Sequence, residues 1–378
     1  MESLPNAWLA IENGLIACFG EGEVIPFSDD EVLDCKGGMV MPAFCDSHTH
    51  LVYAGSREQE YEDKIRGLSY EEIAKRGGGI LNSAKLLSLT SEDELFEQSL
   101  PRAREIIRSG TGAVEIKSGY GLNTQDELKM LRVIRRLQEE TELTIRSTFL
   151  GAHALPSEYK SDQDKYVQLV IEEMIPAVAE ENLADFIDVF CDRGFFTVEQ
   201  TGKILEAGAR YGLVPKIHAN ELDYSGGIQV GVKHHARSVD HLEFVGEDEL
   251  AALRKSETMP TILPGASLFL GMSYAPARLM IDAGLPVALA SDYNPGSSPS
   301  GNMELVMSLG IIQLKMLPFE VLNAVTRNGA YAMGLEDTHG SLTPGKVANL
   351  IITEPIPGFG YMPYSYGSSQ IRKVILNG

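Results

Sequence analysis

A hydrophobic run near the amino-terminal end of the chain reads MPAFCDSHTH, residues 41–50, and ends in two histidines separated by one residue. Side chains alternate between the two faces of a β-strand, so His48 and His50 are expected to point the same way. Two neutral imidazoles in that relation can bind one divalent metal ion. Such a pair also occurs by chance, and its meaning depends on what the rest of the chain places near it.

Apolar segments of strand length alternate with amphipathic segments of helical periodicity from this run onward. We expect strands at 40–49, 113–118, 144–152, 186–191, 216–219, 238–242, 258–263 and 287–291. The helices expected between them are clearest at 127–140, 166–180, 198–211 and 247–255. This alternation predicts an α/β fold, a TIM-like (β/α)8 barrel. The alternative, an open doubly wound sheet, would need a glycine-rich phosphate turn after its first strand, and the sequence has none there.

The two ends of the chain have a different pattern, with short β-type runs separated by glycine and aspartate. These runs are 9–11, 14–19 and 23–26 near the amino terminus, and 341–352 and 371–376 near the carboxyl terminus. We therefore predict a small β-sandwich-like domain built from residues 1–42 and 340–378, beside a barrel formed by residues 43–339.

The composition is that of an ordinary globular protein: 378 residues, of which 44% are hydrophobic and 22% charged. The formal net charge of −21 disfavours nucleic acid and anionic membrane surfaces as partners. Four scattered cysteines, with no membrane-length apolar run and no signal peptide, predict a cytoplasmic protein. The overall charge would repel an anionic substrate, so the site for one must supply its own cation.

Further metal-binding side chains follow other predicted strands at their carboxyl ends, which lie together at one mouth of a barrel. His218 lies at the end of the fifth strand, and Asp292 follows the eighth. With His48 and His50 they form a suitable ligand set for one Zn²⁺ or Fe ion, leaving a position for water. The fourth strand has no lysine that could bridge a second metal, so we predict a single ion. Each histidine alone could be a structural hydrogen-bonding residue, and it is their convergence that indicates a metal site.

Two more residues at the same mouth have the chemistry of a proton carrier and an anion stabiliser. Glu221 lies three residues after His218 and is predicted to take a proton from water and pass it to a leaving nitrogen. The alternative for Glu221 is an ordinary surface carboxylate in a loop. His241, at the end of the sixth strand, is predicted to orient or stabilise a developing oxyanion.

Five longer segments surround these residues or lie between them. They are DSHTHLVYAGSR (46–57), SYEEIA leading into GGGI (69–80), EIKSGYGL (115–122), LGAHA (150–154) and SDYNPGSSP (291–299). The histidine pair with the other ligands follows the pattern of the metal-dependent amidohydrolase superfamily. The five segments together resemble one family within it, the imidazolonepropionases, and the resemblance runs from about residue 8 to the carboxyl terminus.

The resemblance implies hydrolysis of 4-imidazolone-5-propanoate to N-formimidoyl-L-glutamate in histidine degradation, by cleavage of a cyclic amide. It implies the ligand and catalytic roles given above, with Asp292 also helping to deprotonate water. Arg57 resembles the residue that meets the substrate's propionate, which suits a planar, bidentate guanidinium. The resemblance also implies a homodimer. The substrate contacts that it implies are Arg57, Tyr70, Tyr120, His153, Glu221, Asn294, Gly296 and Ser297.

Two other functions stay open at this point. A related aminohydrolase (deaminase) acting on another nitrogen heterocycle would share the metal ligands and Glu221, but it would release ammonia. A non-catalytic scaffold on the same fold would be expected to have lost metal ligands, and every proposed ligand is present. The amino-terminal lead is shorter than is usual in the family, which leaves the outline of the small β domain open.

Overall fold

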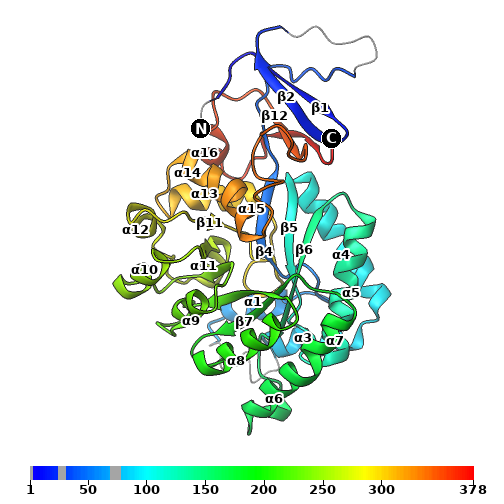
Figure 1. The fold of residues 1–378 in the computed structure, drawn as a ribbon, viewed down its shortest axis with the longest axis vertical. Helices are drawn as coiled ribbons and strands as arrows, with labels where there is room; N and C mark the ends of the chain where they lie inside the picture. Colours follow the sequence, from blue (N-terminus) through cyan, green and yellow to red (C-terminus); the bar gives the residue numbers. More distant parts are fainter. Residues whose placement is uncertain (1–2, 24–30, 69–77) are drawn as a thin grey trace.

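The computed structural model describes residues 3–23, 31–68 and 78–378. Within these residues, eight parallel strands pair in the order β11-β10-β9-β8-β7-β6-β5-β4, with helices around them (Figure 1). This arrangement confirms the predicted (β/α)8 class. The strands are β4 Phe44–Thr49, β5 Thr111–Lys117, β6 Thr144–Ala152, β7 Phe186–Cys191, β8 Val214–Ala219, β9 Ser238–His241, β10 Met259–Ile262 and β11 Ala288–Leu289.

The segment after β11 joins the last strand of this order to the first and closes the barrel. Tyr293 forms a parallel bridge with Thr49 of β4. The side chain of Asp46 accepts hydrogen bonds from the backbone N–H and the hydroxyl of Ser291, at 3.0 and 2.5 Å. These two residues are 245 positions apart, so closure brings the two ends of the barrel sequence to one place.

Helices cover the outside of the barrel, and their apolar faces form its outer core. For example, α4 begins with a capping box between Ser91 and Glu94 and buries Leu95, Phe96 and Ile106. None of the helices described is long and apolar enough to cross a membrane. The helices are α1 Glu58–Ile65, α3 Ile80–Leu89, α4 Glu92–Arg108, α5 Thr124–Glu140, α6 Gln163–Leu169, α7 Ile175–Glu180, α8 Val198–Ala209, α9 Gly227–Lys233, α10 Glu247–Leu253, α11 Pro264–Leu270, α12 Ala277–Asp282, α13 Met303–Ile312, α14 Pro318–Asn323, α15 Gly329–Ala332 and α16 Tyr361–Tyr364.

Segments from both ends of the chain form small sheets beside the start of β4 (Figure 1). β1 (Ala7–Glu12) and β2 (Leu15–Glu21) are an antiparallel pair. β12 (Leu350–Thr353) lies between β3 (Val40–Pro42) and β13 (Ile371–Ile375) in a three-stranded sheet. Most of the predicted run 23–26 lies outside the described residues. The division into domains after residues 42 and 339 stays a prediction.

Residues 40–49, which the sequence predicts as one strand, form two strands in different sheets. Met41 pairs with Ile351 of β12, whereas Cys45 pairs with Ala113 of β5. Ala43 lies between the two strands, and its N–H donates to a backbone carbonyl of the terminal segment. An apolar run does not reveal this change of partner, because both strands are largely buried.

Candidate active site

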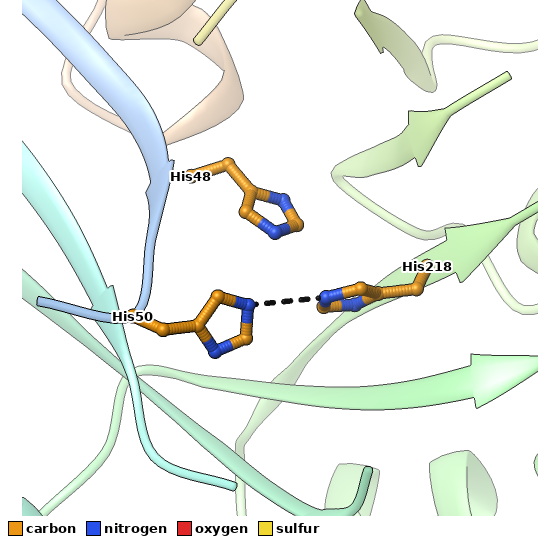
Figure 2. A group of neighbouring side chains, drawn as sticks. All are labelled: His48, His50 and His218. Atoms are coloured by element: carbon orange, nitrogen blue, oxygen red, sulfur yellow. Dashed lines mark hydrogen bonds between the residues drawn. The ribbon is translucent and has the colours of Figure 1, made fainter. Parts of the chain in front are cut away.

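The four predicted metal ligands converge at the carboxyl ends of the barrel strands. His48 and His50 come from the end of β4, His218 from β8, and Asp292 from the segment after β11. Nε2 of His50 and Nε2 of His218 lie 3.3 Å apart (Figure 2). Oδ1 of Asp292 lies 3.5 Å from Nε2 of His48 and 3.8 Å from Nε2 of His50. Ligands at about 2.1 Å from a tetrahedral ion are about 3.4 Å apart, so the spacing fits a single ion.

The state of the histidines also fits a metal ion. Burial lowers the pKa of His48 and of His50 well below the ordinary value, and nearby positive charges lower it further. Both imidazoles are therefore neutral near pH 7, which is the form that binds a metal. Nε2 of His48 is buried and has no hydrogen-bond partner in the described part of the chain. A neutral, unpartnered nitrogen beside three other donors is what a metal ligand requires.

Buried carboxylates hold two of these histidines from behind. Asp240 Oδ2 lies 2.6 Å from Nδ1 of His48, and Asp188 Oδ2 lies 3.0 Å from Nδ1 of His218. A carboxylate in this position accepts a hydrogen bond from Nδ1–H. This fixes the tautomer in which the lone pair of Nε2 is free to bind the metal. Burial raises the pKa of Asp188, but its interactions with His218 and Lys117 outweigh burial and hold that pKa well below the usual value. Neighbouring strands thus set the orientation of these two imidazole rings.

Two buried lysines balance the carboxylates inside the barrel. Nζ of Lys117 donates to Glu115 at 2.6 Å and to Asp188 at 2.8 Å, and lies 3.7 Å from Asp240. Lys216 forms a second ion pair with Glu115. Burial lowers the pKa of Lys117, but the surrounding carboxylates raise it by more. Lys117 is therefore a charged partner of three carboxylates, which leaves it no free lone pair for a metal.

Glu221 and His241 face each other at the mouth. Oε2 of Glu221 lies 3.6 Å from Nδ1 of His241, and Asp192 accepts the backbone N–H of Glu221 at 2.7 Å. Burial raises the pKa of Glu221 well above its usual value, and the charges of Glu243, Asp292 and Asp192 raise it further. Burial lowers the pKa of His241. A carboxyl group that takes up a proton more readily than usual suits a general base that must also act as an acid.

The backbone at the ends of these strands turns sharply. The φ angle is 55° at Asn220, 85° at His241 and 56° at Asp292. None of these residues is glycine, and the left-handed region costs free energy for a residue that has a side chain. Such outliers gather at functional sites, and here they lie on or beside three of the predicted site residues.

Aromatic rings line another side of the mouth. His153 stacks on His50, with ring centroids 5.0 Å apart and planes 11° apart, and Tyr120 lies 5.5 Å from His153. Nδ1 of His153 lies 3.0 Å from the carbonyl of Gly119. Burial lowers the pKa of His153 to about 3. The ring is therefore neutral, donates from Nδ1 and offers Nε2 as an acceptor.

The predicted substrate residues after β11 bond to one another. Oδ1 of Asn294 accepts the backbone N–H groups of Gly296 and Ser297, both at 2.8 Å. Nδ2 of Asn294 donates to the carbonyl of Asp292 at 2.7 Å, and the Ser297 hydroxyl donates to Oδ2 of Asp292 at 3.1 Å. These bonds orient Asp292 and fix the loop. Contact of the loop with substrate stays a prediction.

Arg57 is the residue that precedes α1, and its side chain extends to the same mouth. Its guanidinium packs on the loop after β11, where a Cβ on Gly296 would overlap Nη1. Burial raises the pKa of Tyr120, and the positive charge of Arg57 opposes that rise. The predicted contact Tyr70 lies outside the described residues.

Comparison with known proteins agrees with this geometry. The model of the amidohydrolase family matches residues 39–378. This chain belongs to the amidohydrolase family. Proteins named imidazolonepropionase are 56% identical in Christiangramia forsetii, 55% in Flavobacterium johnsoniae and 42% in Thermoanaerobacter pseudethanolicus. The alignments cover 100%, 100% and 99% of this amidohydrolase and 93%, 92% and 90% of those proteins, which places it among the imidazolonepropionases.

Solved structures share the fold of this amidohydrolase at much lower identity. The 5-methylcytosine deaminase of Klebsiella pneumoniae with 5-fluorocytosine has a TM-score of 0.78 at 17% identity, over 98% of this chain and 92% of that one. The guanine deaminase of C. acetobutylicum with bound guanine has a TM-score of 0.74 at 15% identity, over 99% and 94%. Likeness at this identity concerns the barrel and carries no information about the substrate.

The charged residues behind the proposed ligands of this amidohydrolase are not among the predicted site residues. Asp188 lies between two apolar residues of β7, Asp240 follows Val239 in β9, and Glu115 and Lys117 alternate along β5. A charged residue inside an apolar strand is a usable signal, because burial of an unpaired charge is costly. Glu115 and Lys117 pair within β5, but the bonds of Lys117 to Asp188, of Asp188 to His218 and of Asp240 to His48 join different strands and are visible only in the fold.

Proposed function

We propose that this amidohydrolase hydrolyses 4-imidazolone-5-propanoate to N-formimidoyl-L-glutamate. The observation that carries the proposal is the 56% identity, over the full chain, to a protein named imidazolonepropionase. The ligand geometry supports a hydrolytic metal site, and Arg57 supplies the cation that an anionic substrate needs in a protein of net charge −21. A second function, deamination of another heterocycle, is not favoured, because the likeness to the two deaminases is to their fold alone.

His48, His50, His218 and Asp292 would hold one Zn²⁺ or Fe ion. When bound, the ion lowers the pKa of a water molecule and polarises the substrate carbonyl. The donor set of three imidazoles and one carboxylate suits either metal.

In the proposed reaction the protein residues move protons and position the ring. Glu221, with help from Asp292, takes a proton from water, whose oxygen then adds to the ring carbonyl carbon at C4. His241 stabilises the negative oxygen of the tetrahedral intermediate. Glu221 returns the proton to the ring nitrogen as the carbon–nitrogen bond breaks. One water molecule is consumed, a carboxylate forms and no nitrogen is lost.

The remaining predicted residues would bind the substrate. We assign the propionate to Arg57, which can hold a carboxylate bidentately and present the carbonyl to the site. The ring would lie against the aromatic side of the mouth. The further contacts that we propose are Tyr70, Tyr120, His153, Glu221, Asn294, Gly296 and Ser297.

The test supplies 4-imidazolone-5-propanoate made enzymatically and follows the loss of its ultraviolet absorbance, with and without a chelator. We expect turnover that stops on metal removal and returns when Zn²⁺ or Fe²⁺ is added. Ammonia is measured in the same reaction, because a deaminase releases it and this ring opening does not. Ammonia release in proportion to turnover, or no turnover at all, would refute the proposed function.

The proposal also covers the oligomeric state, the location in the cell and the domain boundaries. We propose a homodimer in the cytoplasm, with a barrel of residues 43–339 and a small β domain of residues 1–42 and 340–378. Light scattering of the purified chain measures the oligomeric state. Elemental analysis of protein purified without added metal measures which ion is bound and how many per chain.

A further inference from the structure

We propose that Glu60 is a positioning residue that holds the guanidinium of Arg57 in place for the substrate's carboxylate. This inference rests on the proposed function, because it concerns the site assigned to the propionate. Glu60 would not touch the substrate and would act only through Arg57.

Glu60 is hydrogen-bonded to one edge of the Arg57 guanidinium. Its Oε2 accepts hydrogen bonds from Nε of Arg57 at 3.0 Å and from Nη2 at 2.7 Å. The two side chains are largely buried, with 12% of Arg57 and 15% of Glu60 exposed. Charge-assisted bonds to two nitrogens of a planar group fix its plane as well as its position.

Glu60 is itself held from a second helix. Its Oε2 also accepts the backbone N–H of Gly79 at 3.1 Å, and its Oε1 accepts from Nδ2 of Asn82 at 3.2 Å. Gly79 precedes α3 with a φ of 84°, a conformation that favours glycine. Burial raises the pKa of Glu60, but these bonds and the charge of Arg57 lower it below the usual value, so the carboxylate is ionised. The carboxylate that binds Arg57 therefore belongs to α1 and is hydrogen-bonded to the start of α3.

The opposite edge of the guanidinium lies on the loop that supplies a metal ligand. Nη1 of Arg57 packs so closely on Gly296 that no Cβ fits between them. Asn294 binds the N–H of Gly296, and the same loop carries Asp292. Glu60 on one edge and Gly296 on the other set the distance between the guanidinium and the metal site.

The geometry leaves part of the guanidinium for the substrate. A guanidinium has five N–H donors, and Glu60 accepts from Nε and Nη2 on one edge. The donors that Glu60 does not use can bind the carboxylate that arrives with the substrate.

The experiment measures ligand binding and turnover in the full chain. Calorimetry uses 3-(imidazol-4-yl)propanoate, which has the ring and the propionate but no carbonyl to hydrolyse, and 4-methylimidazole, which lacks the carboxylate. The variants are Glu60→Gln, Arg57→Ala and the double variant. Glu62→Gln is the matched control, because Glu62 is an exposed residue of the same helix and pairs with Arg66. Steady-state kinetics on 4-imidazolone-5-propanoate accompany the binding data.

We expect Glu60→Gln to weaken binding of 3-(imidazol-4-yl)propanoate roughly tenfold. It should leave binding of 4-methylimidazole unchanged, and in the Arg57→Ala background it should have almost no effect. KM should rise by a similar factor with kcat nearly constant, because the carboxylate is remote from the bond that breaks. Glu62→Gln should match the wild type.

Three results would overturn the role of Glu60. The first two are unchanged binding in Glu60→Gln and equal losses for both ligands. Additive losses in the double variant would do so as well, since Glu60 would then act independently of Arg57. The proposed function is tested separately. A wild-type chain that binds the probe but does not open the ring would refute the function and leave the binding test of Glu60 valid.

Discussion

The two sides of the barrel mouth are built in different ways. On the histidine side, His48 and His218 lie on strands, and a buried carboxylate of a neighbouring strand holds each ring. On the arginine side, Arg57 precedes a short helix and contacts Glu60 of that helix and Gly296 of a connecting segment, and Gly79 of another connecting segment binds Glu60. The histidines proposed as metal ligands are thus held by the rigid sheet, and the arginine proposed for the substrate's carboxylate by segments that can change without disturbing the barrel. The following predictions test this division.

The largest effect is expected on the chemical step. Glu221→Gln should lower kcat by a factor of about 10²–10⁴, because the amide cannot take the proton from water. Metal content, measured by elemental analysis, should stay at the wild-type level, since Glu221 is not one of the proposed ligands. Glu247→Gln, an exposed glutamate at the start of α10, is the control. Full activity in Glu221→Gln would contradict the assignment.

The stability of the barrel sheet should depend on Lys117. Lys117→Met leaves the carboxylates of Glu115, Asp188 and Asp240 buried without this partner, so the free energy of unfolding should fall by about 3–5 kcal/mol. Denaturant unfolding followed by circular dichroism measures the loss. Lys203→Met removes an exposed pair with Glu199 and should have little effect. Equal stability of the two variants would mean that the buried network is not what holds the strands.

The carboxylates behind the histidines should control metal affinity. Asp240→Asn should weaken metal binding by about 10–100-fold, because an amide no longer fixes the tautomer of His48. Competition with a chromogenic chelator measures the affinity. Asp185→Asn is the control, since Asp185 lies just before β7, is half-exposed and pairs with Arg146. Unchanged metal affinity with lower activity would mean that Asp240 contributes to the catalytic step and not to metal binding.

The smallest effect is expected on the arginine side. Gly296→Ala places a methyl group against Nη1 of Arg57, so the guanidinium must move and KM should rise roughly tenfold. Metal content should not change, because the methyl group meets no proposed ligand. Gly358→Ala, where an added Cβ meets nothing within 4 Å, is the control. Loss of metal in Gly296→Ala would show that the two sides are not independent.

Part of this architecture can be predicted from local pattern. The strands at 144–152 and 186–191 have the predicted bounds, and each contains several β-branched and aromatic residues, which favour strands. The prediction of one strand at 40–49 is wrong, because burial on both sides of Ala43 hides a change of sheet. The predicted ligands come together at one mouth, because the carboxyl ends of parallel strands share one edge. Their roles stay predictions until metal and turnover are measured.

The sequence by itself determined the kinds of donor atoms and the strands that carry them. Histidines at strand ends, a glutamate three residues past one of them and an arginine after the first strand are all local features. Only the tertiary structure decided which distant groups pair: Asp240 with His48, Asp188 with His218, and Glu60 with the start of α3. The physical reason is that periodicity reports the face on which a side chain lies. Its partner across the barrel depends on strand order and on closure between segments 245 residues apart.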